Sequence, residues 1–428
     1  MLLGCIADDF TGATDLANNL VRTGMRVVQT IGVPSGPLSA EVDCVVIALK
    51  TRTIAPADAV AQSLQALRWL QGQGARQFYF KYCSTFDSWY QGDVRGNIGP
   101  VTEALMDALD TDFTIATPAF PDNGRTVFKG HLFVGDALLS DSGMKDHPLT
   151  PMRDANLVRV MQAQCQSKVG LIDHKAVAAG AAAVTQAIAQ LKSQGVRIAI
   201  VDAVSNDDLT RMGPALRDLP LLTAGSGVAI ALPANFGLQA DPRTSRLPLA
   251  QGRQAIVSGS CSQATLGQVQ HAQDHGVPAW ALDPTALMDD AGQQQAIEQA
   301  LQFAARHPAK PVLVYSSAAP DAVRAIQQRF GVEQAGHRVE QTLAAIARGL
   351  VQQGVRQLVV AGGETSGACV QALEIEQLQI GPQIDPGVPW CHARAALSPE
   401  GLHITLKSGN FGGVDFFTRS FTLLHATA

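Results

Sequence analysis

Short apolar runs recur along the chain, and most of them end in glycine or polar residues. They occupy residues 2–7, 45–49, 78–82, 198–201, 256–257, 312–315 and 358–360. Amphipathic segments lie between them, as after the first run, where Leu16 and Leu20 share helical spacing before Gly24. Uninterrupted apolar runs that alternate with helices are typical of parallel strands buried on both faces of a sheet. The pattern predicts an α/β fold.

A change of pattern at residues 233–252 predicts a domain boundary. This stretch contains turn residues, among them Pro233, Gly237, Pro242 and Gly252, and shows no sustained hydrophobic period. A length of 428 residues also suits about two or three domains. We therefore expect two α/β domains, residues 1–240 and residues 250–428, each with a mostly parallel sheet flanked by helices.

Composition narrows the class of protein. The chain is 46% hydrophobic and 16% charged, its formal net charge is -5, and it contains no run of lysine and arginine. The chain therefore lacks the basic surface that is typical of proteins that bind nucleic acids or membrane surfaces. An anionic small molecule would have to be bound by a few individually placed cations. Seven scattered cysteines without a CxxC pair, and an N-terminus that reaches Asp8 and Asp9 without a basic leader, predict a cytoplasmic protein with reduced thiols and no membrane span.

The first candidate site follows the first apolar run. Ligands of open α/β sheets bind beyond the carboxyl ends of the strands. There, one of Asp8 and Asp9 could accept a proton from a hydroxyl while the other caps a helix or holds a metal through water. Thr11, Gly12 and Ala13 would leave backbone N–H groups open for an anion. The alternative is that these carboxylates, with that of residue 15, only cap the helix, and the residues alone leave the choice open.

A second cluster combines cations with hydroxyl groups at two further strand ends. Lys81 ends one run and is followed by Ser84, Thr85 and Asp87, whereas Arg52 follows a neighbouring run. Lysine and arginine beside hydroxyl donors can clamp a carboxylate or a phosphate. The competing interpretation is a solvated loop whose charges pair with one another, but two cations near two carboxylates favour a functional site.

Glycine-rich turns after strands mark the C-terminal half. Glycine lets a backbone approach a ligand closely, and a helix N-terminus favours phosphate. The residues concerned are Ser258, Gly259, Ser260, Gly362, Gly363, Glu364, Thr365, Lys407 and Gly409. None of the turns has the G-x-x-x-x-G-K-[ST] pattern, and no G-x-G-x-x-G fingerprint follows a strand with a suitable acidic residue downstream. Three such turns predict a nucleotide-phosphate site, but their spacing does not separate ATP from NAD.

Together these motifs resemble the four-carbon acid sugar kinase family, and within it the subgroup whose substrates are 3-oxo-tetronates. The motifs are residues 6–15 (IADDFTGATD), 79–88 (YFKYCSTFDS), 96–101 (GNIGPV), 147–152 (HPLTPM), 362–367 (GGETSG), 381–389 (GPQIDPGVP) and 406–412 (LKSGNFG). They run in order from Leu2 to about Phe417, so the resemblance covers nearly the whole chain.

The resemblance implies an N-terminal domain for the sugar acid, a C-terminal domain for ATP, and catalysis in the cleft between them. The γ-phosphoryl group of ATP, with Mg²⁺, would pass to the C4 hydroxyl of a 3-oxo-tetronate. Asp8, Asp9, Arg52 and Lys81 would surround the acid, with Ser84, Asp87 and Thr11 as further contacts and Asp9 as the favoured base. The ATP contacts would be Ser258, residues 362–365 and Gly409.

Several alternatives stay open. Residues 89–95 form a longer and more aromatic segment than the spacer expected in relatives, so a kinase of threonate or erythronate is the first alternative. An NAD-dependent oxidoreductase that uses Gly362 and Gly363, and a noncatalytic sugar-acid sensor, belong to other classes. The chirality of the acid, the metal ligands, the choice between Asp8 and Asp9, and the oligomeric state, a homo-oligomer included, are not determined by the sequence.

Overall fold

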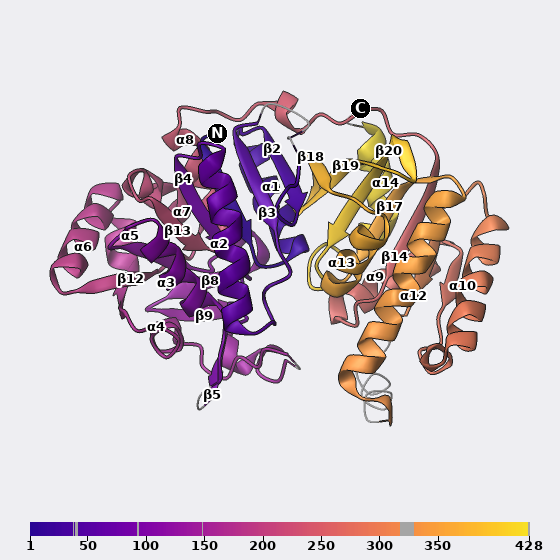
Figure 1. Cartoon of the computed structure of the whole chain (residues 1–428), viewed down its shortest axis with the longest axis horizontal. Coiled ribbons are helices and arrows are strands. Elements are labelled where there is room, and N and C mark those ends of the chain that lie inside the picture. Colours follow the sequence, from indigo (N-terminus) through magenta and orange to yellow (C-terminus); the bar gives the residue numbers. More distant parts are fainter. Residues whose placement is uncertain (37, 39–41, 92–93, 148, 317–328, 427–428) are drawn as a thin grey trace. The chain divides into compact units, whose positions relative to one another are not determined.

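The computed structural model describes residues 1–36, 38, 42–91, 94–147, 149–316 and 329–426. Pro148 of the 147–152 motif, and Gly92 and Asp93 of the aromatic segment, lie outside the described residues. The chain divides into two compact units, Met1–Thr244 and Ser245–Ala428. Figure 1 draws the first unit from indigo to magenta and the second mainly in orange and yellow.

The first unit is built on a parallel sheet. Its strands, in spatial order, are β11 (Lys168–Ile172), β12 (Val196–Val201), β7 (Thr114–Thr117), β13 (Leu221–Ala224), β4 (Gln77–Lys81), β1 (Leu3–Ala7), β3 (Cys44–Ala48) and β2 (Val27–Ile31). Neighbouring strands pair in parallel, for example with Ala7 opposite both Ala48 and Lys81. All five residues of β1 are buried, as expected for a central strand covered on both faces.

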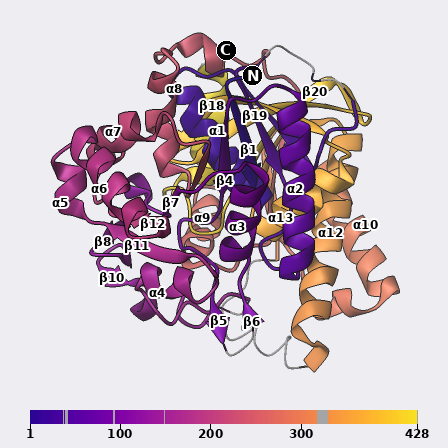
Figure 2. The ribbon, with the colours of Figure 1, turned by 60° about the vertical axis from the view of Figure 1, so that its left-hand side comes forward.

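Helices connect and cover these strands. They are α1 (Phe10–Arg22), α2 (Pro56–Gly72), α3 (Ile98–Ala108), α4 (Leu157–Gln162), α5 (His174–Ala178), α6 (Ala181–Ser193), α7 (Asn206–Met212) and α8 (Leu232–Asn235). Helix α1 packs on β2 and β3, and α2 packs on β1. Figure 2 shows α5, α6 and α7 gathered beside the end of the sheet that carries β12. Short antiparallel pieces complete the unit: β5 (Tyr90–Gln91) with β6 (Val94–Arg95), and β8 (Arg125–Phe128), β9 (His131–Val134) and β10 (Ala137–Leu138).

The second unit has a mixed sheet. In spatial order it contains β18 (Gln377–Asp385), β19 (Val388–Ala395), β20 (Ser398–Lys407), β17 (Val355–Ala361), β14 (Arg253–Ser258), β16 (Val312–Tyr315) and β15 (Ala279–Ala281). Strands β18, β19 and β20 form an antiparallel meander, whereas the pairs from β20 to β15 are parallel. Its helices are α9 (Gln263–Asp274), α10 (Asp290–Ala305), α12 (Val332–Gln352), α13 (Gly363–Ala372) and α14 (Phe416–Ala426).

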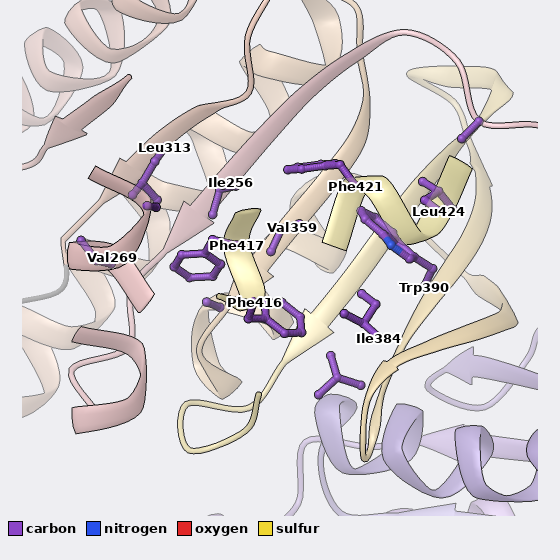
Figure 3. Packing of buried hydrophobic residues seen from close by; sticks show 14 of the residues in the cluster. Ile256, Val269, Leu313, Val359, Ile384, Trp390, Phe416, Phe417, Phe421 and Leu424 are labelled. Atoms are coloured by element: carbon purple, nitrogen blue, oxygen red, sulfur yellow. The ribbon is translucent and has the colours of Figure 1, made fainter. Parts of the chain in front are cut away.

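Figure 3 shows how one face of this sheet forms a core with α9 and α14. Ile256, Val359 and Trp390 come from the strands, and Phe416 and Phe421 come from α14. Trp390 is fully buried, and its indole N–H donates to the carbonyl of Ser420 at 2.8 Å, so the one polar atom of the ring is satisfied. This packing fixes α14 against the sheet that carries the glycine-rich turns.

The predicted fold class is confirmed, because both units are α/β with mostly parallel sheets and flanking helices. The helix after β1 begins at Phe10, directly after Asp9, where a capping carboxylate was expected. The helix after β17 begins at Gly363, several residues before its apolar spacing becomes visible. The alanine-rich residues 176–191, whose composition favours a single helix, instead belong to α5 and α6, which are separated at Gly180, whose φ of +99° suits glycine alone.

The seven cysteines lie within the described ranges, and none of them takes part in a disulfide bond there. None of the helices in the described ranges has the length and apolar character needed to cross a membrane.

Candidate functional site

Adjacent strand ends of the first unit bring the predicted acidic and basic residues together. Asp8 follows β1, Lys81 is the last residue of β4, and Arg52 lies four positions beyond the end of β3. Strand β1 pairs with both β3 and β4 in register, so the three residues meet at one edge of the sheet. A parallel sheet places its ligands at this edge.

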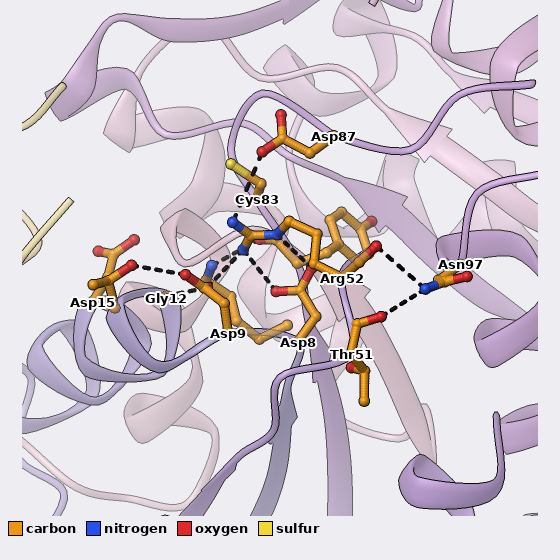
Figure 4. A network of polar contacts seen from close by, with 12 residues as sticks. Asp8, Asp9, Gly12, Asp15, Thr51, Arg52, Cys83, Asp87 and Asn97 are labelled. Atoms are coloured by element: carbon orange, nitrogen blue, oxygen red, sulfur yellow. Dashed lines mark hydrogen bonds and ion pairs between the residues drawn. The ribbon is translucent and has the colours of Figure 1, made fainter. Parts of the chain in front are cut away.

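Arg52 joins the two carboxylates (Figure 4). Its Nε and Nη2 donate to Oδ2 and Oδ1 of Asp8 at 2.9 and 2.8 Å, and Nη2 also donates to Oδ1 of Asp9 at 2.6 Å. Arg52 Nη1 lies 3.8 Å from Oδ2 of Asp87. A two-pronged guanidinium–carboxylate contact fixes both groups in direction as well as in distance. The predicted cluster therefore exists as an ordered ion-pair network.

Asn97 holds the segment that carries Arg52. Its Nδ2 donates to the carbonyls of Thr51, Arg52 and Ile54 at 2.6, 3.2 and 3.0 Å. Asn97 was not among the predicted site residues, although it lies in the 96–101 motif, directly before α3. In the structure its amide is buried, and a buried side-chain amide must find partners.

Asp9 caps helix α1. Its Oδ1 accepts the backbone N–H of Gly12 at 3.0 Å, and its Oδ2 accepts the hydroxyl of Thr11 at 2.7 Å. The expectation that the N–H groups of Gly12 and Ala13 are open was therefore wrong, because the side chain and the carbonyl of Asp9 accept them. A role as helix cap and membership of the charged cluster are thus compatible, because the Asp9 carboxylate caps α1 and also contacts Arg52.

Lys81 is buried under the start of α1. Its side chain is 1% exposed, and its Nζ donates to the carbonyl of Tyr82 at 2.7 Å. A Cβ added to Gly12 would lie 2.9 Å from this ammonium and would collide with Asp9. Glycine at position 12 therefore lets the helix start, the ammonium and the Asp9 carboxylate approach one another.

The loop after β4 is held in an unusual backbone conformation. Phe86 and Asp87 have φ angles of +67° and +39°, a region that L-residues rarely adopt and that costs about 1–3 kcal/mol per residue. The ring of Phe86 packs edge-on against Tyr82, and the Thr85 hydroxyl donates to Asp87 at 2.7 Å. Ser84 is buried in the same loop. In this backbone conformation the Asp87 carboxylate faces Arg52.

Burial and charge act in opposite directions on these carboxyls. Burial raises the pKa of Asp8 above its usual value, even though Arg52 opposes the shift. Burial also acts to raise the pKa of Asp9, but the charges of Arg52 and Lys81 and the bonds from Thr11 and Gly12 outweigh it, so this pKa is lowered. Asp9 is therefore ionised at neutral pH.

Two charged residues near the network were not among the predicted site residues. Asp15, one turn further along α1, is 3% exposed and accepts a hydrogen bond from the Ser226 hydroxyl. Arg125, the first residue of β8, is 9% exposed and interacts electrostatically with Asp15, Asp87 and Cys83. Arg125 lies outside every motif of the sequence, so no pattern could have placed it here.

The turns of the second unit also converge. Ser258 ends β14 opposite Ala361, the last residue of β17, and the N–H of Gly259 donates to the carbonyl of Ala361 at 3.0 Å. A Cβ on Gly259 would collide with the Thr365 hydroxyl, and one on Gly362 would lie 3.2 Å from the Ser260 nitrogen. Gly363 and Glu364 are exposed in the first turn of α13. These small residues leave the backbone accessible at a helix N-terminus, an arrangement that suits phosphate.

Lys407 organises the third turn. It is fully buried, and its Nζ donates to the Thr265 hydroxyl at 3.0 Å and to the carbonyls of Ser408, Gly409 and Phe411 at 3.0, 3.1 and 3.2 Å. A Cβ on Gly409 would lie 2.5 Å from Oγ of Ser260, so this loop adjoins the turn after β14. The predicted cation is thus present, but its ammonium points into the loop.

Comparison with known proteins finds two family models that match successive parts of the chain. Residues 3–232 match the family model described as a sugar-binding N-terminal domain, and residues 255–417 match a nucleotide-binding C-terminal domain. A Burkholderia multivorans protein named 3-oxo-tetronate kinase is 57% identical, with 100% of this chain and 98% of that protein aligned. A Haemophilus influenzae protein of the same name is 46% identical, with 97% and 98% aligned.

Solved structures of similar chains share the fold. A Salmonella typhimurium protein has a TM-score of 0.85 at 44% identity over 98% of each chain. A Haemophilus influenzae protein has a TM-score of 0.76 at 46% identity over 98% of this chain and 100% of its own.

Proposed function

The chain belongs to the family that joins a sugar-binding N-terminal domain to a nucleotide-binding C-terminal domain, and from this premise we propose that it is an ATP-dependent kinase of a four-carbon 3-oxo acid. It transfers the γ-phosphoryl group to the C4 hydroxyl of a 3-oxo-tetronate. The observation that carries the proposal is the name 3-oxo-tetronate kinase, which is shared by relatives 53–57% identical over nearly their whole length.

In this proposal the network at the strand ends of residues 1–240 binds the acid. Arg52 and Lys81 supply positive charge for the substrate carboxylate or the transferred phosphoryl group. The polar groups of Thr11, Ser84 and Asp87 complete the surroundings of the substrate. The Thr11 hydroxyl already donates to Asp9, so its contribution is to hold that carboxylate in place.

Asp9 is the proposed base. Its side chain is 19% exposed, against 8% for Asp8, and its lowered pKa keeps it ionised. Phosphoryl transfer depends chiefly on positioning and charge stabilisation, so an ionised carboxylate that orients the attacking hydroxyl and accepts its proton is sufficient. Asp8, bonded through both oxygens to Arg52, keeps that guanidinium in position.

The turns of residues 250–428 are the proposed ATP site. Ser258, Gly259, Ser260 and the start of α13 at Gly362–Thr365 would contact phosphate through hydroxyl and N–H groups, with Gly409 beside them. Lys407 holds the Gly409 loop. The described residues contain no group of three or more His, Cys, Asp or Glu that could hold a metal ion. Mg²⁺ would thus arrive with ATP, bound by phosphate oxygens and water.

The test is an assay of purified full-length protein with ATP and Mg²⁺ against 3-oxo-tetronate, threonate and erythronate. We expect ADP formation with the 3-oxo acid and, by phosphorus NMR, a phosphate monoester at C4. Preference for threonate or erythronate would change the proposed substrate but would still support the proposed kinase activity. Absence of ADP formation with all three acids, or reduction of NAD by a hydroxy acid, would overturn the proposal.

A further inference from the structure

The carboxyl group of Asp15 is buried on the side of α1 that faces the acid-binding network. Its Oδ2 accepts the Ser226 hydroxyl, whereas no group in the described ranges donates a hydrogen bond to the buried Oδ1. The carbonyl of Ser226 accepts the side chain of Asn19 at 2.9 Å, which fixes the hydroxyl-bearing residue. A buried carboxylate anion with one unsatisfied oxygen is costly, whereas a neutral carboxyl group tolerates this environment.

The charges around Asp15 point to the same state. Lys81 on β4, Asp9 at the cap of α1 and Arg125 on β8 interact with it electrostatically, and so does the phenol of Tyr79 on β4. Together with the rest of the network, the described residues here provide the carboxylates of Asp8, Asp9, Asp15 and Asp87 and the cations Arg52, Lys81 and Arg125. With every group ionised, the carboxylates outnumber the cations by one.

An incoming sugar acid adds a further negative charge. Burial raises the pKa of Asp15 to about 7, in spite of Lys81 and the Ser226 hydroxyl, which lower it. An anion bound nearby raises this pKa further, because like charges disfavour ionisation. Near neutral pH the carboxyl group is thus poised to gain a proton when the substrate binds.

We propose that Asp15 takes up one proton when the anionic sugar acid binds, so that the network receives the acid only with Asp15 neutral. Asp15 is then a positioning residue that acts through the charge of the site, and the O–H bond that forms takes its proton from solvent. The inference rests on the proposed function, since it concerns the acid bound by the same network.

The linkage gives a quantitative expectation. The carboxyl group of a sugar acid stays ionised above about pH 5. Below about pH 7 Asp15 is already protonated, and the KM for the acid should be nearly independent of pH. Above this value each pH unit should raise the KM about tenfold, because one proton must be bound together with the acid.

The experiment measures the KM for 3-oxo-tetronate at saturating ATP between about pH 6 and about pH 9 in the wild type, Asp15→Asn and Asp112→Asn. Asp112 is 72% exposed in a surface ion pair, which makes it a matched control for loss of one carboxylate. Asp15→Asn, permanently neutral, should abolish the rise and bind the acid more tightly than the wild type at the alkaline end. Asp112→Asn should keep the wild-type profile.

Ser226→Ala gives an independent arm if Asp15→Asn does not fold. Loss of the hydroxyl removes a bond that lowers the pKa of Asp15, so the rise in KM should begin at higher pH. A wild-type KM that is flat with pH, a rise that survives in Asp15→Asn, or an unshifted profile in Ser226→Ala would each overturn the inference. Lack of turnover with every four-carbon acid would instead overturn the proposed function.

Discussion

The two units build their candidate sites from different materials. The first unit uses buried charges, with Arg52 bonded to Asp8 and Asp9 and Lys81 enclosed beneath α1. The second unit uses glycines, hydroxyl groups and backbone, and its buried cation Lys407 is occupied by loop carbonyls. Electrostatic pairing thus holds the residues of the first site together. In the second site, glycines without side chains let the turns at the strand ends approach one another closely.

This difference determines how substitutions should affect each site. Removal of one member of a buried charge network leaves its partners unpaired, at a cost of several kcal/mol. A side chain added in a glycine turn blocks the approach of a ligand and strains the backbone, with a smaller and more local cost. Substitutions in the two units should therefore separate the kinetic constants for the acid from those for ATP.

The largest effect is expected for Arg52→Met. It leaves the buried carboxylates of Asp8 and Asp9 without their shared partner, which should cost about 2–5 kcal/mol, or about 30-fold to 5,000-fold in kcat/KM for the acid. Arg26→Met is the control, since Arg26 is 54% exposed in its pair with Asp43 and should contribute little. Steady-state kinetics should show an unchanged KM for ATP, and a loss confined to ATP would contradict the expectation.

Asp9→Asn should come next. It retains the size of the side chain and much of the helix cap but removes the charge that accepts the proton, so kcat should fall about a hundredfold or more. The KM for ATP and the circular dichroism spectrum should stay as in the wild type. Should Asp8→Asn lose more kcat than Asp9→Asn, the assignment of the base would move to Asp8. Near-normal kcat in both variants would leave Asp9 as a helix cap and Asp8 as a partner of Arg52, with the base elsewhere.

Gly362→Ala should have a moderate effect on ATP alone. Its φ of +122° disfavours a Cβ, which would also lie 3.2 Å from the Ser260 nitrogen, so the KM for ATP should rise about tenfold. Gly354→Ala is the matched control, because its φ is +92° but no atom lies within 4 Å of the added Cβ. Both variants should lose stability, and only Gly362→Ala should weaken ATP. Equal ATP kinetics in the two variants would argue against a nucleotide at this turn.

The smallest effect concerns Lys407 and pH. Burial lowers the pKa of Lys407 from 10.5 to about 7, so between these values the unfolded chain binds more protons and stability rises with pH. This group should contribute at most about 1.4 kcal/mol per pH unit. In thermal melts above about pH 8, Lys407→Met should show a weaker rise of stability with pH than the wild type. An identical pH dependence would mean that Lys407 titrates normally.

The fold class and the strand ends could be predicted from the sequence because parallel strands buried on both faces consist of continuous apolar runs. The meander of β18, β19 and β20 could not be predicted, since its residues do not alternate cleanly: β19 is buried at nearly every position. The start of α13 lacks a hydrophobic signal for a related reason. Its first turn, residues 363–366, consists of glycine and polar residues, which have no hydrophobic period.

Within the site, the sequence identified the residues that local motifs place at strand ends. It could not identify Arg125 or the role of Asn97, because their positions depend on contacts between segments far apart in the chain. It also could not show that Lys407 points into its loop or that Thr11 donates to Asp9, since the direction of a side chain is set by its neighbours. The assignment of roles to these residues stays a prediction.

Hydrogen exchange of the full-length protein with each ligand in turn tests the division of labour most directly. A non-hydrolysable ATP analogue should protect amides of residues 258–262, 362–367 and 407–411, and the sugar acid should protect residues 8–13, 51–52 and 81–88. Protection by the nucleotide at residues 8–13, with none at the turns of the second unit, would contradict the account.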